Sequence, residues 1–345
     1  MLLFRADGNE KIGTGHVMRC LAIAEAAAEY GVGSVFVTAD YEMERVIKQR
    51  NHDCYVLDTD YRENDENRLE AIAEDIKPDA IFVDSYYVSQ DYFFNLFSWC
   101  HSNNCKLIYI DDLKAFPYCC DFLVNYQIHA NYYEYDALYS ACSKPSLLLG
   151  LKYVPLRREF GTLVSNVVKK EVLDVLVSTG GADPENLSIE LMKRAMFEDY
   201  RFHFVIGAMN SDRKVLKELS RRASNIHIYE NVSKMSVLME SCDIAISASG
   251  STLYELCSLR VPTISYILAD NQKEIAEAFD AKGIIRNCGD IRIIGKEKLA
   301  EVLLENVNLL SRNYKERCEI VDRMSSVVDG KGAGRIVRAL LSNIE

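Results

Sequence analysis

The sequence lacks clustered positive charge. No block of lysine or arginine interrupts its 345 residues, and the formal net charge is −11 at pH 7. Because surfaces that bind nucleic acid need clustered cations to displace counterions, we expect no nucleic-acid partner. An anionic small molecule is compatible with this charge where helix N-termini and a few placed side chains hold it.

The sequence also lacks an apolar run of membrane length and an N-terminal stretch with the basic, apolar and small-residue order of a signal peptide. We therefore expect no integral membrane segment and a cytoplasmic location. The eleven cysteines are scattered, as reduced thiols would be. The paired spacing of a zinc site is missing, so we expect neither metal nor cofactor from Cys100, His101, Cys105, Cys119 and Cys120.

Short apolar runs alternate with helical patterns along the chain, which is typical of parallel α/β architecture. One series begins with the strand MLLFRAD, and a second begins with VLDVLVSTGG. Between them the pattern breaks from Leu149 to Val168, which we interpret as a linker. The chain is longer than one core usually serves. We predict an α/β fold with two Rossmann-like parallel-sheet domains facing a cleft, residues 1–155 and 156–345. The last helix of the second could cross back to the first.

Polar residues at the carboxyl ends of the first strands are candidates for ligand binding, because ligands of open parallel sheets bind there. The first strand ends in Arg5 and Asp7, and the loop IGTGH then brings Gly15 and His16 to the start of a helix that includes Arg19. The loop lacks the third glycine of the dinucleotide-binding motif. His16 is therefore a candidate base or proton donor, although a structural role in the turn remains open.

Two further strand ends in the first half carry carboxylates. VDSY contains Asp84 and Tyr86, and IDDL contains Asp111 and Asp112. Aspartates after buried strands often cap helices, and capping accounts for at least one of each set. Two acidic strand ends near one histidine would nevertheless make a site that handles protons.

The second half carries signals for a diphosphate. STGGADPEN contains a diglycine turn that includes Gly181. IAISASGSTLYEL places small residues in the first turn of a helix, whose N–H groups and dipole could hold a diphosphate without a metal; these are Ser249, Gly250, Ser251 and Thr252.

Other polar residues of the second half suit the remainder of a nucleotide. Glu255 lies one turn further along the same helix, within reach of a ribose diol. Asn271 and Gln272 in ADNQ supply amides at another helix start. Ordinary capping of each helix is the alternative explanation for these residues.

Several of these motifs resemble a known family. The helix SGSTLYEL, followed by VP and ADNQ, resembles the nucleotide-binding half of glycosyltransferase-B proteins such as MurG. FRADGNEKIGTGHVMRCLAIA resembles the signature of the PseG/SpsG family. Further matches spread the resemblance over nearly the whole chain: VDSY, YIDDL, GLKYVPLRREF, TGGADPEN and DGKGAGRI. A departure is the tyrosine in NYQ, Tyr126, where a closer match would continue an Asn-Gln pattern.

The resemblance implies roles for single residues. His16 would be catalytic. The predicted sugar ligands are Arg5, Asp7, Gly15, Arg19, Asp84, Tyr86 and Asn271. The predicted UDP ligands, with a uracil pocket made by the segment from Ile228 to Met235, are Gly181, Ile228, Met235, Ser249, Gly250, Ser251, Thr252, Glu255 and Gln272.

The resemblance also implies a reaction. PseG is the UDP-2,4-diacetamido-2,4,6-trideoxy-β-L-altropyranose hydrolase of pseudaminic acid synthesis, and SpsG is its spore-coat polysaccharide relative. We therefore expect metal-independent, inverting hydrolysis of a UDP-activated deoxy-amino sugar, with that UDP-sugar as substrate and UDP as product, in surface polysaccharide biosynthesis. A glycosyltransferase that uses a nucleotide-sugar donor and a non-catalytic nucleotide-sugar-binding protein are the alternatives.

Overall fold

The computed structural model describes residues 1–9, 11–161, 167–207 and 209–343. The chain divides into two compact units. The first consists of Met1–Arg158 together with Gly330–Glu345, and the second of Glu159–Asp329. Residues 162–166 of the expected linker lie outside the described residues.

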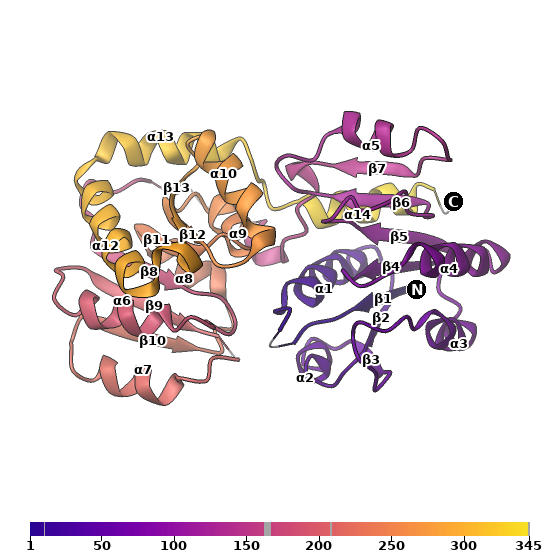
Figure 1. Cartoon of the computed structure of the whole chain (residues 1–345), viewed down its shortest axis with the longest axis horizontal. Coiled ribbons are helices and arrows are strands. Elements are labelled where there is room, and N and C mark those ends of the chain that lie inside the picture. The colour runs from indigo at the N-terminus through magenta and orange to yellow at the C-terminus, as the bar shows by residue number, and fades with distance from the viewer. Residues whose placement is uncertain (10, 162–166, 208, 344–345) are drawn as a thin grey trace. The chain divides into compact units, whose positions relative to one another are not determined.

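The first unit contains a seven-stranded parallel sheet in the order β3-β2-β1-β4-β5-β6-β7 (Figure 1). Its strands are β1 (Leu2–Ala6), β2 (Ser34–Thr38), β3 (Asp53–Val56), β4 (Ala80–Asp84), β5 (Lys106–Ile110), β6 (Phe122–Asn125) and β7 (Ser146–Leu149). Its helices are α1 (Gly15–Ala28), α2 (Glu44–Lys48), α3 (Glu66–Ile76), α4 (Gln90–Ser102), α5 (Tyr132–Leu138), α14 (Gly332–Leu341) and the short 3-10 helix η1 (Leu151–Tyr153).

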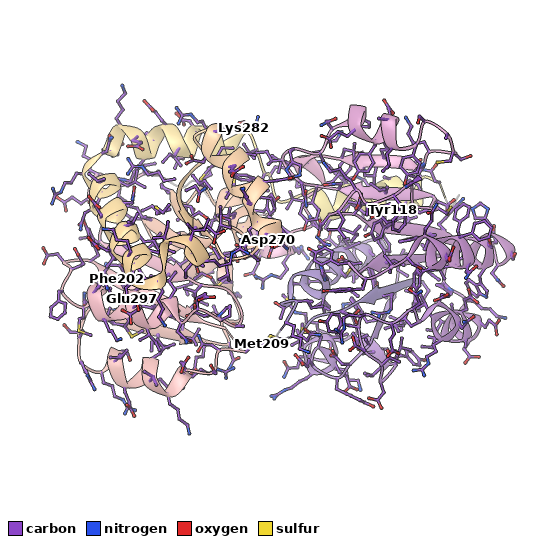
Figure 2. The ribbon with its side chains drawn as sticks, in the orientation of Figure 1. Tyr118, Phe202, Met209, Asp270, Lys282 and Glu297 are labelled. Carbon is purple, nitrogen blue, oxygen red and sulfur yellow. The ribbon has the colours of Figure 1, made fainter. Side chains whose placement is uncertain are left out.

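The centre of this sheet is apolar on both faces, as helices on both sides of a parallel sheet require. Every residue of β1 and β4 is buried. Phe4 stacks on Phe36 of β2 and on Phe82 of β4, with ring centroids 5.0 Å and 4.8 Å apart. A second aromatic group includes Tyr118, which is labelled in Figure 2 and lies 4.3 Å from the ring of Tyr109. The sheet is thus held rigidly below the loops that follow its strands.

The strand order reverses between β1 and β4. From β1 the chain proceeds outward to β2 and β3, and then returns to place β4 on the other side of β1. At such a switch point the loops after the two strands diverge, which opens the crevice where ligands of this architecture bind. The loop and first turn after β1 contain His16, and the segment after β4 contains Tyr86.

The last helix returns to the first unit. α14, yellow in Figure 1, contacts both α1 and η1. Gly332 permits this approach, because a Cβ at that position would lie 2.1 Å from the carbonyl oxygen of Val154.

Replacing Gly332 with alanine should therefore destabilise the first unit by about 1–3 kcal/mol, the usual effect of overpacking. Trp99, the single tryptophan, lies in α4 of this unit, so its fluorescence during urea unfolding measures the change. Gly334→Ala is the matched control, since its Cβ would meet only the end of Arg338 at 3.6 Å. Equal unfolding midpoints for the two variants would contradict the close packing inferred here.

The second unit contains a six-stranded parallel sheet in the order β10-β9-β8-β11-β12-β13. Its strands are β8 (Asp174–Ser178), β9 (Arg201–Ile206), β10 (Ile226–Glu230), β11 (Ile244–Ala248), β12 (Thr263–Ile267) and β13 (Ile285–Asp290). Its helices are α6 (Leu187–Ala195), α7 (Arg213–Ser220), α8 (Met235–Ser241), α9 (Thr252–Ser258), α10 (Lys273–Ala281), α11 (Ile291–Ile294), α12 (Lys296–Arg312) and α13 (Tyr314–Ser325), with the 3-10 helix η3 (Asp270–Gln272). Its switch point lies between β8 and β11. A further 3-10 helix, η2 (Arg158–Phe160), spans the boundary between the two units.

The predicted α/β class with two parallel sheets is confirmed. All eleven cysteines are free thiols. In the part of the chain that the structure describes, no helix combines the length and apolar character needed to cross a membrane. The same residues contain no group of three or more His, Cys, Asp or Glu side chains that could hold a metal ion.

Candidate functional site

His16 occupies the first turn of α1, at the switch point of the first sheet. The residue is 5% exposed, and its Nδ1 atom has no hydrogen-bond partner among the described residues. The ring of Tyr86 meets the imidazole edge to face, with centroids 4.4 Å apart and planes at 88°. His16 is therefore held by packing and by its place on the helix.

The surroundings of His16 favour a neutral imidazole. Burial lowers the pKa of His16 below its ordinary value, and the positive charge of Arg19 acts in the same direction. The carboxylates of Asp84, Asp112 and Asp7 oppose this shift without reversing it. A neutral ring at pH 7 is the form that can accept a proton.

Arg19 ties α1 to the ends of three strands. Its Nε atom donates to Asp84 Oδ2 at 2.6 Å, and Nη2 donates to Asp84 Oδ1 at 2.5 Å. Its Nη1 atom donates to Asp112 Oδ2 at 2.8 Å and to the hydroxyl of Tyr126 at 2.6 Å. These partners follow or end β4, β5 and β6, so a single guanidinium connects the carboxyl ends of all three.

The aspartates after β4 and β5 have different roles. Burial by itself would raise the pKa of Asp84, but Arg19, His16 and Cys20 together hold that pKa below its ordinary value. Asp111 accepts the N–H groups of Leu113 and Lys114, both at 2.9 Å, and therefore fixes a turn. No helix lies between β5 and β6, where every residue is described, so Asp111 fixes a turn and not the helix cap that the sequence suggested, while Asp112 faces the cluster around Arg19.

Arg5, near the carboxyl end of β1, lies at the centre of a second buried cluster. Its Nη1 is 2.7 Å from Asp7 Oδ1, and its Nη2 is 2.6 Å from Asp65 Oδ2. Asp7 Oδ1 also accepts the N–H of Ala39 at 2.8 Å, whereas Asp7 Oδ2 is buried with no hydrogen-bond partner in the described residues. Tyr92 donates to Asp65 at 3.3 Å. Nη1 of Arg5 likewise makes no hydrogen bond to the described residues, although it forms the ion pair with Asp7.

The two clusters together contain more carboxylates than cations. Arg19 is shared by Asp84 and Asp112, and Arg5 is shared by Asp7 and Asp65, with all six side chains at most 8% exposed. The neutral His16 does not compensate this excess. A phosphate would be repelled here, and a group that develops positive charge would be stabilised.

In the second unit, the structure corrects the predicted start of one helix. α9 begins at Thr252, with Ser251 as its N-cap, so Ser249 and Gly250 precede the helix. The strand pairing continues to Ser249, whose N–H donates to the carbonyl of Tyr266 at 2.9 Å. The Ser249 hydroxyl is fully buried and bonds Ser265 Oγ at 2.6 Å. Both polar groups of Ser249 are thus engaged within the sheet.

Two other predicted UDP ligands lie together. A Cβ on Gly250 would lie 3.6 Å from Nε2 of Gln272, and Oε1 of Gln272 accepts the N–H of Leu268 at 2.9 Å. The side-chain amide therefore spans from the end of β12 to the loop before α9. Asn271 precedes Gln272 in η3 and is exposed, and Glu255 is half-buried in α9.

Gly181 lies in a loop that its neighbours hold closely. A Cβ on Gly207 would lie 2.1 Å from the Gly181 carbonyl oxygen. The N–H of Met209, a residue labelled in Figure 2, donates to that same oxygen at 3.2 Å. Asp183 follows and accepts the N–H groups of Leu187 and Ser188 at the start of α6.

The predicted uracil segment runs from β10 into α8. Ile228 is half-buried in β10, and Met235, 9% exposed, begins α8. The next residue, Ser236, donates through its N–H and its hydroxyl to Glu159 Oε2, at 3.2 Å and 3.0 Å. Glu159 thereby anchors the beginning of the second unit to α8, a role that the sequence did not suggest.

The structure brings most predicted sugar ligands into one neighbourhood of the first unit, around His16 and Arg19; Gly15 begins the same helix, and Asn271 lies in the second unit. Sequence reasoning missed four members of these clusters. In the cluster of Arg5 they are Asp65 and Tyr92. In the cluster of Arg19 they are Tyr126 after β6 and Gln127, whose Nε2 lies 3.3 Å from Asp112 Oδ1. The one available signal was the tyrosine that interrupts the Asn-Gln pattern of the family.

Similar proteins were found in sequence. A family model, the glycosyltransferase family 28 C-terminal domain, matches residues 172–327. An uncharacterized protein of Methanocaldococcus jannaschii is 27% identical over 362 residues, which is 98% of this chain and 69% of that protein. The UDP-2,4-diacetamido-2,4,6-trideoxy-β-L-altropyranose hydrolase of Campylobacter jejuni is 24% identical over 82% of this chain and 97% of its own length.

The spore coat polysaccharide biosynthesis protein SpsG of Bacillus subtilis is 25% identical over 50% of this chain, a match that spans 51% of that protein. The resemblance to the PseG/SpsG family is confirmed. The names of these two relatives refer to hydrolysis of a UDP-sugar and to biosynthesis of a polysaccharide.

Solved structures show the fold of the PseG/SpsG-like chain. MurG of Acinetobacter baumannii matches with a TM-score of 0.63 at 14% identity, covering 99% of both chains. The spinosyn rhamnosyltransferase SpnG, solved with thymidine diphosphate, matches with a TM-score of 0.66 at 12% identity over 99% of this chain and 100% of that one. The predicted glycosyltransferase-B fold is confirmed.

Proposed function

We propose that the protein hydrolyses a UDP-activated deoxy-amino sugar, similar to a UDP-2,4-diacetamido-2,4,6-trideoxyhexose, to the free sugar and UDP. The reaction would need no metal ion and would invert the anomeric carbon. It would belong to pseudaminic-acid-type, spore-coat or other surface polysaccharide biosynthesis. Similarity to the Campylobacter jejuni hydrolase and to SpsG supports this assignment.

One observation carries the proposal: a buried histidine with a lowered pKa lies at the switch point of the first sheet. A general base must be unprotonated at the working pH, and burial provides this for His16. Because its Nδ1 atom makes no hydrogen bond to the described residues, the ring is not committed to a structural contact there. The geometry therefore suits proton abstraction better than a purely structural role.

The proposed mechanism is a single displacement. A water molecule attacks the anomeric carbon while the imidazole of His16 accepts one of its protons. The bond between that carbon and the diphosphate oxygen breaks, and its electron pair leaves with UDP. The proton then passes from His16 to solvent, which restores the neutral base.

The excess of buried carboxylates around Arg5 and Arg19 supports the same chemistry. Displacement at an anomeric carbon passes through a transition state with oxocarbenium character, in which the sugar ring becomes positive. Four carboxylates that share two guanidiniums stabilise such a charge through space.

The second unit would bind UDP in this proposal, through the loops that contain Gly181, Gly250 and Gln272. Replacing Gly207 with alanine should push the Gly181 loop outward, because the new Cβ would meet the Gly181 carbonyl. We expect UDP to bind about tenfold more weakly, since such clashes typically amount to ~1–3 kcal/mol. Calorimetric titration with UDP measures this, with Gly334→Ala as a control outside the second unit. An unchanged affinity would remove Gly181 from the UDP site.

The pH dependence follows from the buried base. Below its pKa, His16 is protonated and cannot accept a proton, so kcat/KM should fall on the acid side. Because burial lowers that pKa, the acid limb should lie below the reference value of about 6.5. A rate profile measured with a UDP-sugar between pH 4 and 9 would reveal it. An acid limb well above that reference would indicate a different base.

A glycosyltransferase is the second candidate, because the glycosyltransferase family 28 model matches residues 172–327. Incubation of the protein with a UDP-sugar and no acceptor distinguishes the two reactions. Release of UDP together with free sugar supports hydrolysis. Release of UDP only after an acceptor alcohol is added would overturn our proposal in favour of transfer.

A further inference from the structure

Arg19 uses most of its N–H groups in contacts within the protein, so few of them remain to bind a substrate. A guanidinium offers five N–H groups, and four hydrogen bonds already run from Arg19 to Asp84, Asp112 and Tyr126. Its side chain is 8% exposed. The two bonds to Asp84 have the fork geometry that makes an arginine–carboxylate pair rigid. Arg19 is thus committed to contacts that hold the surroundings of His16 in place.

The first turn of α1 depends on these contacts of Arg19. Thr14 occupies the N-cap position but makes no side-chain capping hydrogen bond, so the usual anchor of a first helical turn is missing. Arg19 follows His16 by three positions, and residues with this spacing lie on one face of a helix. By fixing Arg19 to the ends of β4 and β5, the structure also fixes the turn from which the His16 ring projects.

A series of contacts through Asp112 and Tyr86 connects Arg19 to the ring of His16. The Asp112 Oδ2 atom that accepts from Arg19 also accepts the hydroxyl of Tyr86, at 3.1 Å. The ring of Tyr86 then packs edge to face on His16. Since Nδ1 of His16 has no hydrogen-bond partner within the described residues, this packing takes the place of the hydrogen bond that commonly orients a catalytic histidine.

We propose that Arg19 is a positioning residue that holds the His16 ring through α1 on one side and through Asp112 and Tyr86 on the other. The expected effect of Arg19 on kcat rests on the proposed function. The orientation of the His16 ring by Arg19 does not. It reassigns Arg19, which the sequence suggested as a sugar ligand. In this role Asp112 connects the two residues, because it accepts hydrogen bonds from both Arg19 and Tyr86.

Arg19→Lys is the sharpest test, because lysine keeps the charge but cannot bridge two carboxylates and a hydroxyl in one plane. We expect kcat to fall by about 10- to 100-fold and KM to change less than about threefold, since small misplacements of a catalytic group act on the chemical step. Tyr86→Phe, which keeps the ring but loses the bond to Asp112, should lower kcat about three- to tenfold. Arg50→Lys is the matched control, as Arg50 forms a half-buried ion pair with Glu25, which lies on α1 like Arg19.

A double-mutant cycle shows whether Arg19 acts through His16. In a His16→Ala background, Arg19→Lys should have no further effect on the residual rate, whereas independent contributions would multiply. A KM that rises more than kcat falls, or equal losses with and without His16, would overturn the proposal.

A measurement without turnover separates this inference from the proposed function. In ¹⁵N NMR of the full-length protein, Arg19→Lys should change the ring signals of His16, assigned by comparison with His16→Ala, and Arg50→Lys should not. If no UDP-sugar is hydrolysed but the ring signals respond in this way, the function is wrong and the positioning role stands. Unchanged His16 ring signals in Arg19→Lys would overturn the positioning role whatever the reaction is.

Discussion

Replacing His16 with alanine should lower kcat for UDP-sugar hydrolysis by about 10²–10⁴-fold, the usual contribution of a positioned general base. The imidazole is the group that we propose to accept the proton of the attacking water. UDP affinity should be unchanged, because the proposed UDP ligands lie in the second unit. Steady-state kinetics and calorimetric titration with UDP test the two statements together.

His101→Ala is the control for this variant. His101 lies at the end of α4 with a side chain that is 52% exposed, so its removal should leave kcat unchanged. If His16→Ala retains near-normal turnover, the histidine is structural. If it loses UDP affinity as well as turnover, the assignment of UDP binding to the second unit is wrong.

Replacing Arg5 with methionine should destabilise the first unit by about 3–5 kcal/mol. Methionine fills a similar volume but leaves Asp7 and Asp65 buried without their counter-ion. Removing one member of a buried ion pair is far more damaging than replacing the whole pair, because the remaining charges stay desolvated. Urea unfolding followed by Trp99 fluorescence reports on this unit.

Arg62→Met provides the comparison. Arg62 also binds a carboxylate through two nitrogens, that of Asp60, but the pair lies at the surface. Exposed ion pairs contribute little, so the unfolding midpoint of Arg62→Met should equal that of the unchanged protein. An Arg5→Met variant as stable as Arg62→Met would show that the buried cluster does not support the fold.

The sequence was sufficient for the central elements of the fold because their signals are local. β1 and β4 are apolar runs interrupted only near their carboxyl ends, by Arg5 and Asp84, and α1 has apolar residues at helical spacing. The strands that it did not predict lie at sheet edges. β7 reads SLLL beside the break in the pattern, and β13 reads IRNCGD, of which Ile285 alone is buried. Both segments therefore carry a weaker apolar signal than the central strands.

Parts of the candidate site were predictable for the same reason. His16 is identifiable because a histidine directly follows a glycine turn at a helix start. The partners of Arg19 cannot be identified in this way, because Asp84, Asp112 and Tyr126 are 65, 93 and 107 positions away in sequence. Which of two adjacent aspartates caps a turn and which faces the cluster depends on the direction of the chain after β5.

The predicted helix start at Ser249 was wrong for a related reason. Small residues such as serine and glycine suit either the end of a strand or the first turn of a helix. The decision depends on the hydrogen bond between the Ser249 N–H and the Tyr266 carbonyl, which extends the sheet by one residue. Pairing between the successive strands β11 and β12 therefore overrides the local preference.

The central claim is that His16 activates water for attack on a UDP-activated sugar. The most direct measurement is ¹H NMR of a small panel of UDP-linked deoxy-amino sugars, incubated with the protein and a chelator in the absence of any acceptor. We predict that one member of the panel is converted to UDP and a free sugar whose first-formed anomer is inverted, and that His16→Ala stops this conversion. Retention of configuration, or a sugar released only to an added acceptor, would contradict the account.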